Sequence, residues 1–588
     1  MPLKMGASRA SAATTGDRLE TAPDTGIAEL EQALVLLRER ASAFARAPLT
    51  DKVAWLREIG SRFHELGPRI VAAACAAKGT RLGSPLEGEE WVSTVVPIIR
   101  NLKQLAGSLD QVRRAGAPNI EPERVSFTGD GRVAVVVTPH EWYDGLLYAP
   151  FRAKTWFAGH VDGSELTRFQ AAFYGRREPE GRVALVLGAG NVASIPVLDV
   201  IYKSFVEGAV CLLKMSPVNA YLGPIFELAL WPLIWRGFLR IVYGGPEVGA
   251  HLVAHPAIDE LHITGSLETH DRIVWGPAGP ERTERKRRGT PLFAKPVSSE
   301  LGNISPVLLV PGKYSDAELT TIARGLTGMV VQNASFNCNA AKMLITPRGF
   351  AQREPLLARL KAELEKVPPR NAYYPGAAAR YASLTKDAAH VTRIGDAGPG
   401  QLPWTLISEL DPQASAPQFS VEPFCSILSE VSVGSADPLE FLSSATEFAN
   451  ERLWGTLNAM LYVTPQLEQD PVLSQALEHA LGALRYGTVG VNQWPSAAYA
   501  LGTAPWGGHP SVSLADVQSG LGWVHNALLF DAPAIEKTVQ RGPLRAFPAP
   551  PYFPGHRSLH RLGRALADFE AAPSAAGLAK VGYFAVRA

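Results

Sequence analysis

Cysteine is scarce in this chain of 588 residues, and no two cysteines have the C-x-x-C spacing. The four that occur are Cys75, Cys211, Cys338 and Cys425. Because they lie far apart, they predict neither a disulfide framework nor a structural zinc site. We therefore expect a reducing, cytoplasmic location. His251 and His255 are four residues apart, but Pro256 ends their helix and no acidic or cysteine partner lies at ligand spacing, so we expect no metal.

The chain also lacks an excess of charge of either sign. Its formal net charge is +1 and its pI is about 7.8, whereas nucleic-acid-binding domains usually carry a concentrated basic excess. The one basic cluster, residues 282–288, is flanked by glycine and proline. We interpret it as a solvated loop, with a phosphate-binding patch as the alternative. The sequence therefore predicts no nucleic-acid partner.

Long uninterrupted apolar runs are absent as well. The most apolar stretch, residues 221–242, is broken by three charged residues and two prolines, whereas a membrane span needs about 20 apolar residues with few charges. We expect a buried domain helix there and no stable membrane insertion. Residues 1–26 contain no apolar core, so they predict a disordered leader and not a secretory signal.

What the chain does contain is a long alternation of strand and helix patterns. Hydrophobic residues make up 46% of the sequence, and its length predicts two or three domains. Buried strand runs such as residues 183–187 (VALVL) and 210–214 (VCLLK) are separated by helical segments. This order predicts βαβ crossovers and mostly parallel sheets, an α/β fold with two separate α/β domains.

Polar and glycine residues follow several of these strands, where open α/β sheets bind ligands. Gly188-Ala189-Gly190-Asn191 follows the first strand and indicates either a dinucleotide-binding turn or a tight glycine turn. Lys214 ends the next strand, as a ligand-binding or a surface lysine. Ser266 opens a helix, where it can act as an N-cap, meet a phosphate, or both.

Two further residues suggest chemistry. Glu300 stands at the edge of an apolar strand, where it is either a general base with a raised pKa or a solvated turn carboxylate. Cys338 lies among Asn and Ser, in QNASFNCNA, and not among Leu and Val. Most cysteines are inert core residues, but these neighbours favour an accessible thiol.

In their order along residues 183–508, these motifs resemble the aldehyde dehydrogenase superfamily. The resemblance implies that Cys338 is the nucleophile, Glu300 the general base and Asn191 part of the oxyanion hole. It also implies that an NAD or NADP cofactor is bound by Lys214, Ser216, Pro217, Gly245, Gly249, Thr264, Gly265, Ser266, Leu301, Glu422 and Phe424. The product is then a carboxylic acid, released from a Cys338 thioester by water that Glu300 activates.

Several positions depart from the family pattern. Ser335-Phe336 replaces Gly-Gln before the cysteine, and Asn303 replaces the second glycine after Glu300. Pro217 stands where NAD-preferring members often carry a glutamate, so NADP is an option beside NAD. These departures keep two alternatives open: a coenzyme-A-acylating aldehyde dehydrogenase or acyl-CoA reductase, and a catalytically silent dinucleotide-binding protein.

The resemblance also implies a domain plan. A Rossmann-like NAD(P)-binding domain takes residues 27–160 and 181–295, and the catalytic domain takes residues 296–524. Residues 161–180 and 525–545 supply a small β oligomerisation element that pairs across subunits, so we expect a homodimer or homotetramer. Residues 546–588 form a proline-rich extension that wraps the surface.

The substrate expected from the resemblance is a small aldehyde. Aromatic residues gather in two segments, at Trp142, Tyr143, Tyr148, Phe151, Trp156 and Phe157, and at Trp494, Tyr499 and Trp506. Core packing explains such clusters by default. If some of them line the substrate channel, with Phe336 beside the thiol, the aldehyde is apolar or aromatic.

Overall fold

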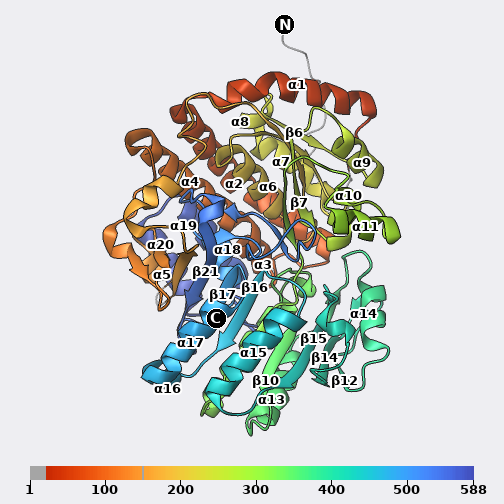
Figure 1. Cartoon of the computed structure of the whole chain (residues 1–588), viewed down its shortest axis with the longest axis vertical. Coiled ribbons are helices and arrows are strands. Elements are labelled where there is room, and N and C mark those ends of the chain that lie inside the picture. The colour runs from red at the N-terminus through yellow and green to blue at the C-terminus, as the bar shows by residue number, and fades with distance from the viewer. Residues whose placement is uncertain (1–21, 149–150, 588) are drawn as a thin grey trace.

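The computed structural model describes residues 22–148 and 151–587, and its framework is two β-sheets covered by helices (Figure 1). The α/β fold expected from the sequence is confirmed. One sheet, with its helices, fills the upper part of Figure 1, and the other fills the lower part. Within the described residues, no helix is both long enough and apolar enough to cross a bilayer.

The described strands of the upper sheet have the order β19-β8-β7-β4-β5-β6. Its strands are β4 (Val183–Leu187), β5 (Val210–Lys214), β6 (Leu239–Val242), β7 (Glu260–Gly265), β8 (Val297–Leu301) and β19 (Gly520–Leu521). All neighbours are parallel except β19 and β8. Parallel strands buried on both faces need continuous apolar runs, which VALVL and VCLLK supply.

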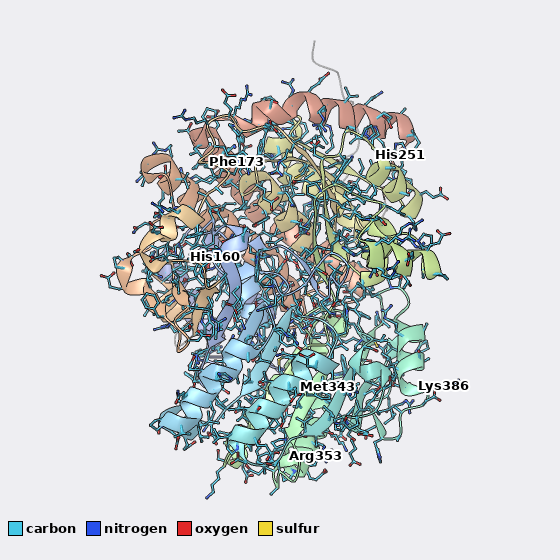
Figure 2. The ribbon with its side chains drawn as sticks, viewed as in Figure 1. His160, Phe173, His251, Met343, Arg353 and Lys386 are labelled. Atoms are coloured by element: carbon cyan, nitrogen blue, oxygen red, sulfur yellow. The ribbon has the colours of Figure 1, made fainter. Side chains whose placement is uncertain are left out.

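Helices cover both faces of this sheet and connect its strands. They are α1 (Ile27–Ala45), α2 (Leu49–Lys78), α6 (Ile195–Phe205), α7 (Gly223–Ala229), α8 (Trp231–Ile234), α9 (Pro246–Ala254), α10 (Leu267–Val274) and α11 (Pro280–Arg288). His251 of α9, labelled in Figure 2, and His255, which directly follows α9, both contact Glu31 of α1, at 2.9 and 3.1 Å. These histidines therefore join two helices, and the described residues contain no cluster of three or more His, Cys, Asp or Glu able to hold a metal ion.

The lower sheet is larger, with the order β1-β2-β3-β21-β17-β16-β9-β10-β15-β14-β12 among the described residues. Its strands are β1 (Val125–Phe127), β2 (Val133–Thr138), β3 (Arg152–Phe157), β9 (Pro306–Leu309), β10 (Met343–Pro347), β12 (Val391–Ile394), β14 (Trp404–Leu410), β15 (Ile427–Val433), β16 (Asn458–Tyr462), β17 (Thr488–Val491) and β21 (Ile535–Arg541). The minor pairs are β11 (Arg370–Asn371) with β13 (Gln401–Leu402), and β18 (Pro505–Trp506) with β20 (Val524–His525).

Helices of the lower half pack on the large sheet. They are α12 (Asp316–Val331), α13 (Arg353–Glu365), α14 (Ala377–Thr385), α15 (Pro438–Arg452), α16 (Pro465–Gln469) and α17 (Pro471–Ala483). The helix α18 (Ser496–Leu501) instead contacts α4 (Val96–Ala115) and β18. The helix α12 begins with a capping box between Ser315 and Glu318. Its buried face packs against α13 and places its end next to Cys338.

The sheets divide the sequence differently from the expected domain plan. Strands β1, β2 and β3 lie in residues 27–160 but belong to the large sheet, because β3 pairs antiparallel with β21. Strands β8 and β19 lie in residues 296–524 but belong to the upper sheet. These crossings tie the two halves together at the site described below.

The β oligomerisation element expected at residues 161–180 does not form strands within this chain. Residues 161–180 contain a 3-10 helix, η3 (Gly163–Phe169), and one isolated bridge from Gln170 to Phe530 of the same chain. Strand β21 is paired within the chain, between β3 and β17. The expected dimer or tetramer stays a prediction.

Two other segments differ from the sequence interpretation. Residues 282–288 are not a loop but lie in the helix α11, which i,i+4 pairs such as Glu281–Arg285 stabilise. The single helix expected from residue 221 is interrupted at Leu230, whose ψ of 10° lies outside the helical range, so it becomes α7 and α8. Prolines at the start of each short helix explain the break.

The C-terminal extension also differs, because it folds. Two helices, α19 (Leu559–Ala571) and α20 (Ala575–Ala585), follow the proline-rich stretch. Figure 1 shows them in blue beside the orange α4 (Val96–Ala115) and α5 (Asp144–Leu147), and α19 packs against α4 and α3 (Glu87–Glu90). The wrapping tail is thus a packed layer. The expected leader, residues 1–26, lies outside the described residues except for 22–26.

Candidate active site

Cys338 lies just beyond a strained turn that follows α12. Asn333, Ala334 and Ser335 have positive φ angles of 50°, 54° and 70°. Three successive non-glycine residues in the left-handed region store strain, which persists only where surrounding contacts hold it. The Asn333 amide supplies such contacts by donating to the carbonyl oxygens of Asn191 (3.0 Å) and Phe336 (3.1 Å). The turn is thereby fixed to the loop after β4.

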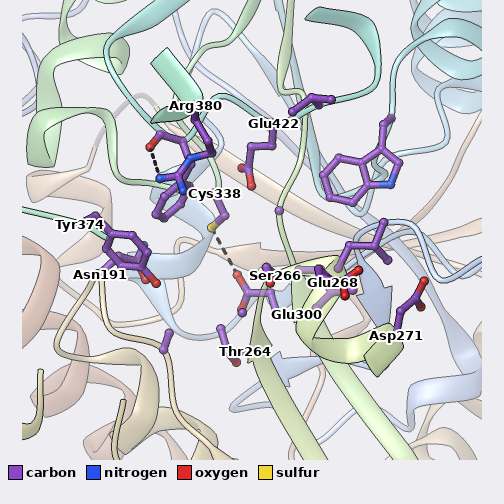
Figure 3. A pocket seen from close by; sticks show the side chains of 18 of the residues that line it. Asn191, Thr264, Ser266, Glu268, Asp271, Glu300, Cys338, Tyr374, Arg380 and Glu422 are labelled. Carbon is purple, nitrogen blue, oxygen red and sulfur yellow. Dashed lines mark hydrogen bonds between the residues drawn. The ribbon is translucent and has the colours of Figure 1, made fainter. Parts of the chain in front are cut away.

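The thiol of Cys338 faces the carboxyl group of Glu300 across 3.4 Å (Figure 3). Glu300 comes from β8 of the upper sheet, and its Oε1 also accepts a hydrogen bond from Trp506 Nε1 at 2.9 Å. Burial raises the pKa of Glu300 to about 7, and the Trp506 hydrogen bond opposes that rise. A carboxyl group with this pKa can accept or release a proton near neutral pH.

The thiol itself is held in its neutral form. Burial and the neighbouring Glu300 raise the pKa of Cys338 well above its ordinary value, while Lys342 lowers it. A thiolate therefore forms here only as its proton moves away, and Glu300 is the base within reach. The sequence-based expectation of a raised pKa at Glu300 agrees with this environment.

Asn191 lies on the other side of the thiol and lines the same cavity. Its side-chain amide donates to the carbonyl oxygen of Phe336 at 2.9 Å. This bond orients the amide toward the segment between α12 and β10 that carries Cys338, called the nucleophile loop below. Among the described residues no acceptor is found for the Cys338 N–H. These two donors are therefore the groups available to an oxyanion that forms at the thiol.

Two cavities meet at Cys338, Glu300, Asn191 and Ile195, which line both. The first has a volume of about 540 Å³, within the range of small-ligand sites. Its other lining residues include Thr264, Gly265, Ser266, Glu268, Asp271, Arg282, Leu301, Gly302, Tyr374, Arg380, Glu422, Phe424 and Trp454. The second cavity, of about 210 Å³, is lined mainly by apolar and aromatic side chains. The reactive pair thus joins a cavity whose wall contains several charged side chains to one that is lined mainly by apolar side chains.

Six of the expected cofactor residues line the first cavity: Thr264, Gly265, Ser266, Leu301, Glu422 and Phe424. Ser266 caps α10 through Thr269 N–H, so the N-cap role expected from the sequence is present. A Cβ on Gly302 would lie 1.8 Å from the Glu422 carboxylate, so this glycine makes room for Glu422. A cavity of this size, with polar groups along its wall, suits a small-molecule ligand or part of a cofactor.

The other five expected cofactor residues lie outside both cavities. Lys214 is buried, donates to the carbonyl oxygen of Met215 at 3.4 Å and runs past Gly249. Ser216 packs against Gly190, Pro217 follows it, and Gly245 is the uncapped N-terminal residue before α9. They surround the carboxyl ends of β5 and β6, where open α/β sheets bind ligands. The structure therefore brings them to the same sheet edge but not to the cavity itself.

Lys342 is a site residue that the sequence interpretation missed. It is buried, and its ammonium group donates to the carbonyl oxygens of Asn303 and Cys338, both at 2.9 Å, and to Glu422 at 2.5 Å. One ammonium group thus links the nucleophile loop, the loop that follows β8 at Asn303, and Glu422. The sequence did offer a signal for it, because Lys342 is a charged residue directly before the apolar strand β10 and only four residues after Cys338.

Arg282 of the basic cluster also reaches the first cavity. Its guanidinium makes a two-pronged contact with Glu268, at 2.7 and 2.9 Å. The remaining cations of α11 pair with neighbouring acids such as Glu284. The cluster is therefore largely neutralised, and one of its arginines is part of the cavity wall.

Fold and site together define a class: an α/β protein in which a cysteine and a glutamate from different parts of the fold meet at the junction of two cavities, one with charged side chains in its wall and one lined mainly by apolar side chains. Residues 151–390 match the model of the aldehyde dehydrogenase family. The chain is 29% identical to betaine aldehyde dehydrogenase 2 of Rhizobium meliloti (strain 1021) over 215 residues, 35% of this chain and 39% of that protein. It is 30% identical to peroxisomal aminoaldehyde dehydrogenase 1 of Pisum sativum over 181 residues, 30% of this chain and 32% of that protein.

Solved structures resemble nearly the whole fold. An NADP-dependent glyceraldehyde-3-phosphate dehydrogenase from Bacillus halodurans C-125, complexed with NADP, matches with a TM-score of 0.58 and 18% identity over 88% of this chain and 92% of that one. An NAD-dependent aldehyde dehydrogenase from Sinorhizobium meliloti also has a TM-score of 0.58 and 18% identity, over 89% of this chain and 88% of that one. At this identity the likeness concerns the fold.

The chain is thus similar to the aldehyde dehydrogenase family in sequence over residues 151–390, and to solved structures of such enzymes in fold. Its sequence matches to these two curated relatives span only about a third of their length, 39% and 32%. The likeness therefore concerns the fold, and the activity is argued separately below.

Proposed function

We propose that the protein oxidises an aldehyde to a carboxylic acid through a covalent intermediate on Cys338, with NAD or NADP as the hydride acceptor. The observation that carries this proposal is the 3.4 Å contact between the Cys338 thiol and Glu300 Oε1 at the junction of the two cavities. A nucleophile beside its base, with a cofactor-sized space on one side and an apolar space on the other, suits this reaction.

The residues act in a fixed order. Glu300 takes the thiol proton as Cys338 attacks the carbonyl carbon, and a tetrahedral thiohemiacetal forms with its charge on oxygen. The Asn191 amide and the Cys338 N–H stabilise that oxygen, and one such donor contributes about 3–4 kcal/mol. The bound nicotinamide supplies the hydride acceptor. Loss of the hydride leaves a thioester on Cys338, and Glu300 passes the thiol proton to solvent. Glu300 then takes a proton from the water that attacks the thioester, and it returns this proton to the departing thiolate as the acid is released.

Lys342 has a positioning role in this scheme. Its ammonium group holds the carbonyl oxygen of Cys338 and the carboxylate of Glu422 at the same time. Glu422 is also fixed by the N–H of Asn303 at 3.1 Å. We infer that Glu422, aimed into the first cavity, accepts hydrogen bonds from the hydroxyl groups of the cofactor's nicotinamide ribose.

The second cavity supports an aldehyde whose remainder is uncharged and apolar or aromatic. Among the described residues that line this cavity, Glu300 is the one acidic, basic or histidine residue. Five residues of the two aromatic clusters contribute to its wall: Tyr148, Phe151, Trp494, Tyr499 and Trp506. Phe336 does not, because it is buried against Tyr373, Tyr374 and Phe424. Its expected place in the substrate channel is wrong.

A quaternary ammonium aldehyde is a second candidate substrate. Aromatic walls without basic groups attract such cations, and several relatives are named for betaine aldehyde. Comparing hexanal, phenylacetaldehyde and betaine aldehyde separates the two classes. Higher kcat/KM for the first two supports the apolar class.

NAD(P)H formation with that aldehyde panel tests the proposed function. We expect turnover that disappears, by at least 10³-fold, in Cys338→Ala. Cys425→Ala is the matched control, because Cys425 is a buried cysteine that lines neither cavity. Oxidation that persists in Cys338→Ala contradicts the mechanism. A sharp rise in turnover on adding coenzyme A favours the acylating alternative, and no turnover with any aldehyde favours the silent one.

A further inference from the structure

The C-terminal extension enters the wall of the second cavity. Pro550, Pro551 and Tyr552 from the proline-rich stretch and Leu566 from α19 all line it. The ring of Tyr552 lies against Trp494, with centroids 5.1 Å apart. Trp494 in turn donates to the carbonyl oxygen of Asn339, the residue after Cys338. The extension is therefore coupled to the nucleophile loop through one tryptophan.

Leu566 and Cys338 line this cavity from two different apolar clusters. Leu566 packs in the same cluster as Val96 of α4, whereas Cys338 packs in the cluster that contains Trp506. Both Val96 and Trp506 are lining residues. The cavity thus extends from the reacting atoms toward the C-terminal helix.

A buried charge network fixes α19 in this position. Glu570 is fully buried and pairs with Arg100 of α4 at 2.9 Å, and Lys103 and Tyr143 reach its other oxygen at 2.5 Å. Arg100 also donates a hydrogen bond to the carboxylate of Asp144 of α5 at 2.8 Å. Because α5 leads directly into Tyr148, another lining residue, the same network holds two sides of the cavity.

We propose that the segment from Pro550 to Glu570 is a specificity element that limits the length of the apolar group the enzyme accepts, with Leu566 as the limiting side chain. The inference rests on the proposed function for its substrate. Removing three carbons at Leu566 opens space for about three more methylenes, and each methylene newly buried improves kcat/KM roughly fourfold. The optimum for unbranched aldehydes should therefore move to longer chains.

The experiment measures kcat/KM for unbranched aldehydes from propanal to dodecanal in Leu566→Ala, Leu566→Trp and Leu562→Ala. Leu562 is the matched control, because it is a buried leucine one turn earlier on α19 that does not line the cavity. We expect longer substrates to gain 10-fold or more in Leu566→Ala and to lose in Leu566→Trp, with propanal unchanged in both. An unchanged profile in both Leu566 variants, or the same shift in Leu562→Ala, overturns the proposal.

A second measurement does not need turnover. The rates at which N-ethylmaleimide and N-hexylmaleimide alkylate Cys338 are compared by peptide mass spectrometry, which separates Cys338 from the three buried cysteines. The ratio of hexyl to ethyl rates should rise in Leu566→Ala and not in Leu562→Ala. If no aldehyde is oxidised but this ratio rises, the proposed function is wrong and the role of Leu566 in limiting the cavity is supported. If aldehydes are oxidised and neither the chain-length profile nor the ratio changes, the proposed function is supported and the role of Leu566 is contradicted.

Discussion

Glu300 has to be charged to act as a base, yet it sits where charge is unfavourable. It is 3% exposed, and its Oε2 has no hydrogen-bond partner among the described residues. Burial is the main reason that its pKa rises from 4.5 to about 7. This group therefore stabilises the folded chain fully below about pH 4.5, and that contribution is lost as the pH rises through 7.

The pH dependence of stability follows from this shift. Between pH 5 and pH 8 the native protein should lose about 3 kcal/mol that Glu300→Gln, which cannot ionise, does not lose. Urea unfolding of both proteins at each pH measures the difference. Equal losses in the two proteins would mean that Glu300 titrates at an ordinary pKa.

The same substitution separates the two chemical steps. Glu300→Gln should keep the amplitude of a single burst of NAD(P)H, because hydride leaves before water is needed, but should slow it, because Glu300 also takes the thiol proton. Steady-state turnover should fall further, by at least 10²-fold. Stopped-flow absorbance with enzyme in excess resolves the burst. A burst that falls as much as the steady state would place Glu300 in thiol activation alone.

At the residue scale, the sequence was informative where a motif carries the chemistry. Cys338, Glu300 and Asn191 come together as expected, because their order along the chain matches a family pattern. Lys342 and the contact of Trp506 with Glu300 were not predicted. Their partners lie 80 and 206 positions away, respectively, and no local pattern reports such distances.

At the element scale, buried strands were predictable and polar helices were not. Runs such as VALVL leave one interpretation, because a parallel strand between two helical layers must be apolar throughout. The helix α11 contains no buried residue, so it has no apolar periodicity to reveal it, and its i,i+4 ion pairs resemble a solvated loop in sequence. The prediction of strands in residues 161–180 was wrong for another reason. It was carried over from the resemblance to a family and did not come from the pattern of these residues.

At the scale of the whole molecule, the C-terminal extension closes the structure back onto its N-terminal half. The proline-rich sequence of residues 546–558 suggested a surface strap, and only the three-dimensional partner of Glu570 reveals the packed layer. That partner, Arg100, lies 470 positions earlier in the chain, and both side chains are fully buried. Long-range charge pairing of this kind has no local sequence signature, which is why the extension was misjudged.

This closure predicts an unequal effect of two neighbouring acids on stability. Glu570→Gln leaves a buried arginine with one carboxylate instead of two and should lower the free energy of unfolding by about 3 kcal/mol. Asp568→Asn, on the same helix, removes only partly exposed pairs with His64, Arg564 and Lys580 and should cost less than 1 kcal/mol. Urea unfolding followed by tryptophan fluorescence compares them. Similar losses in both variants would mean that α19 is held by apolar packing, and that the charge network is not what fixes the cavity wall.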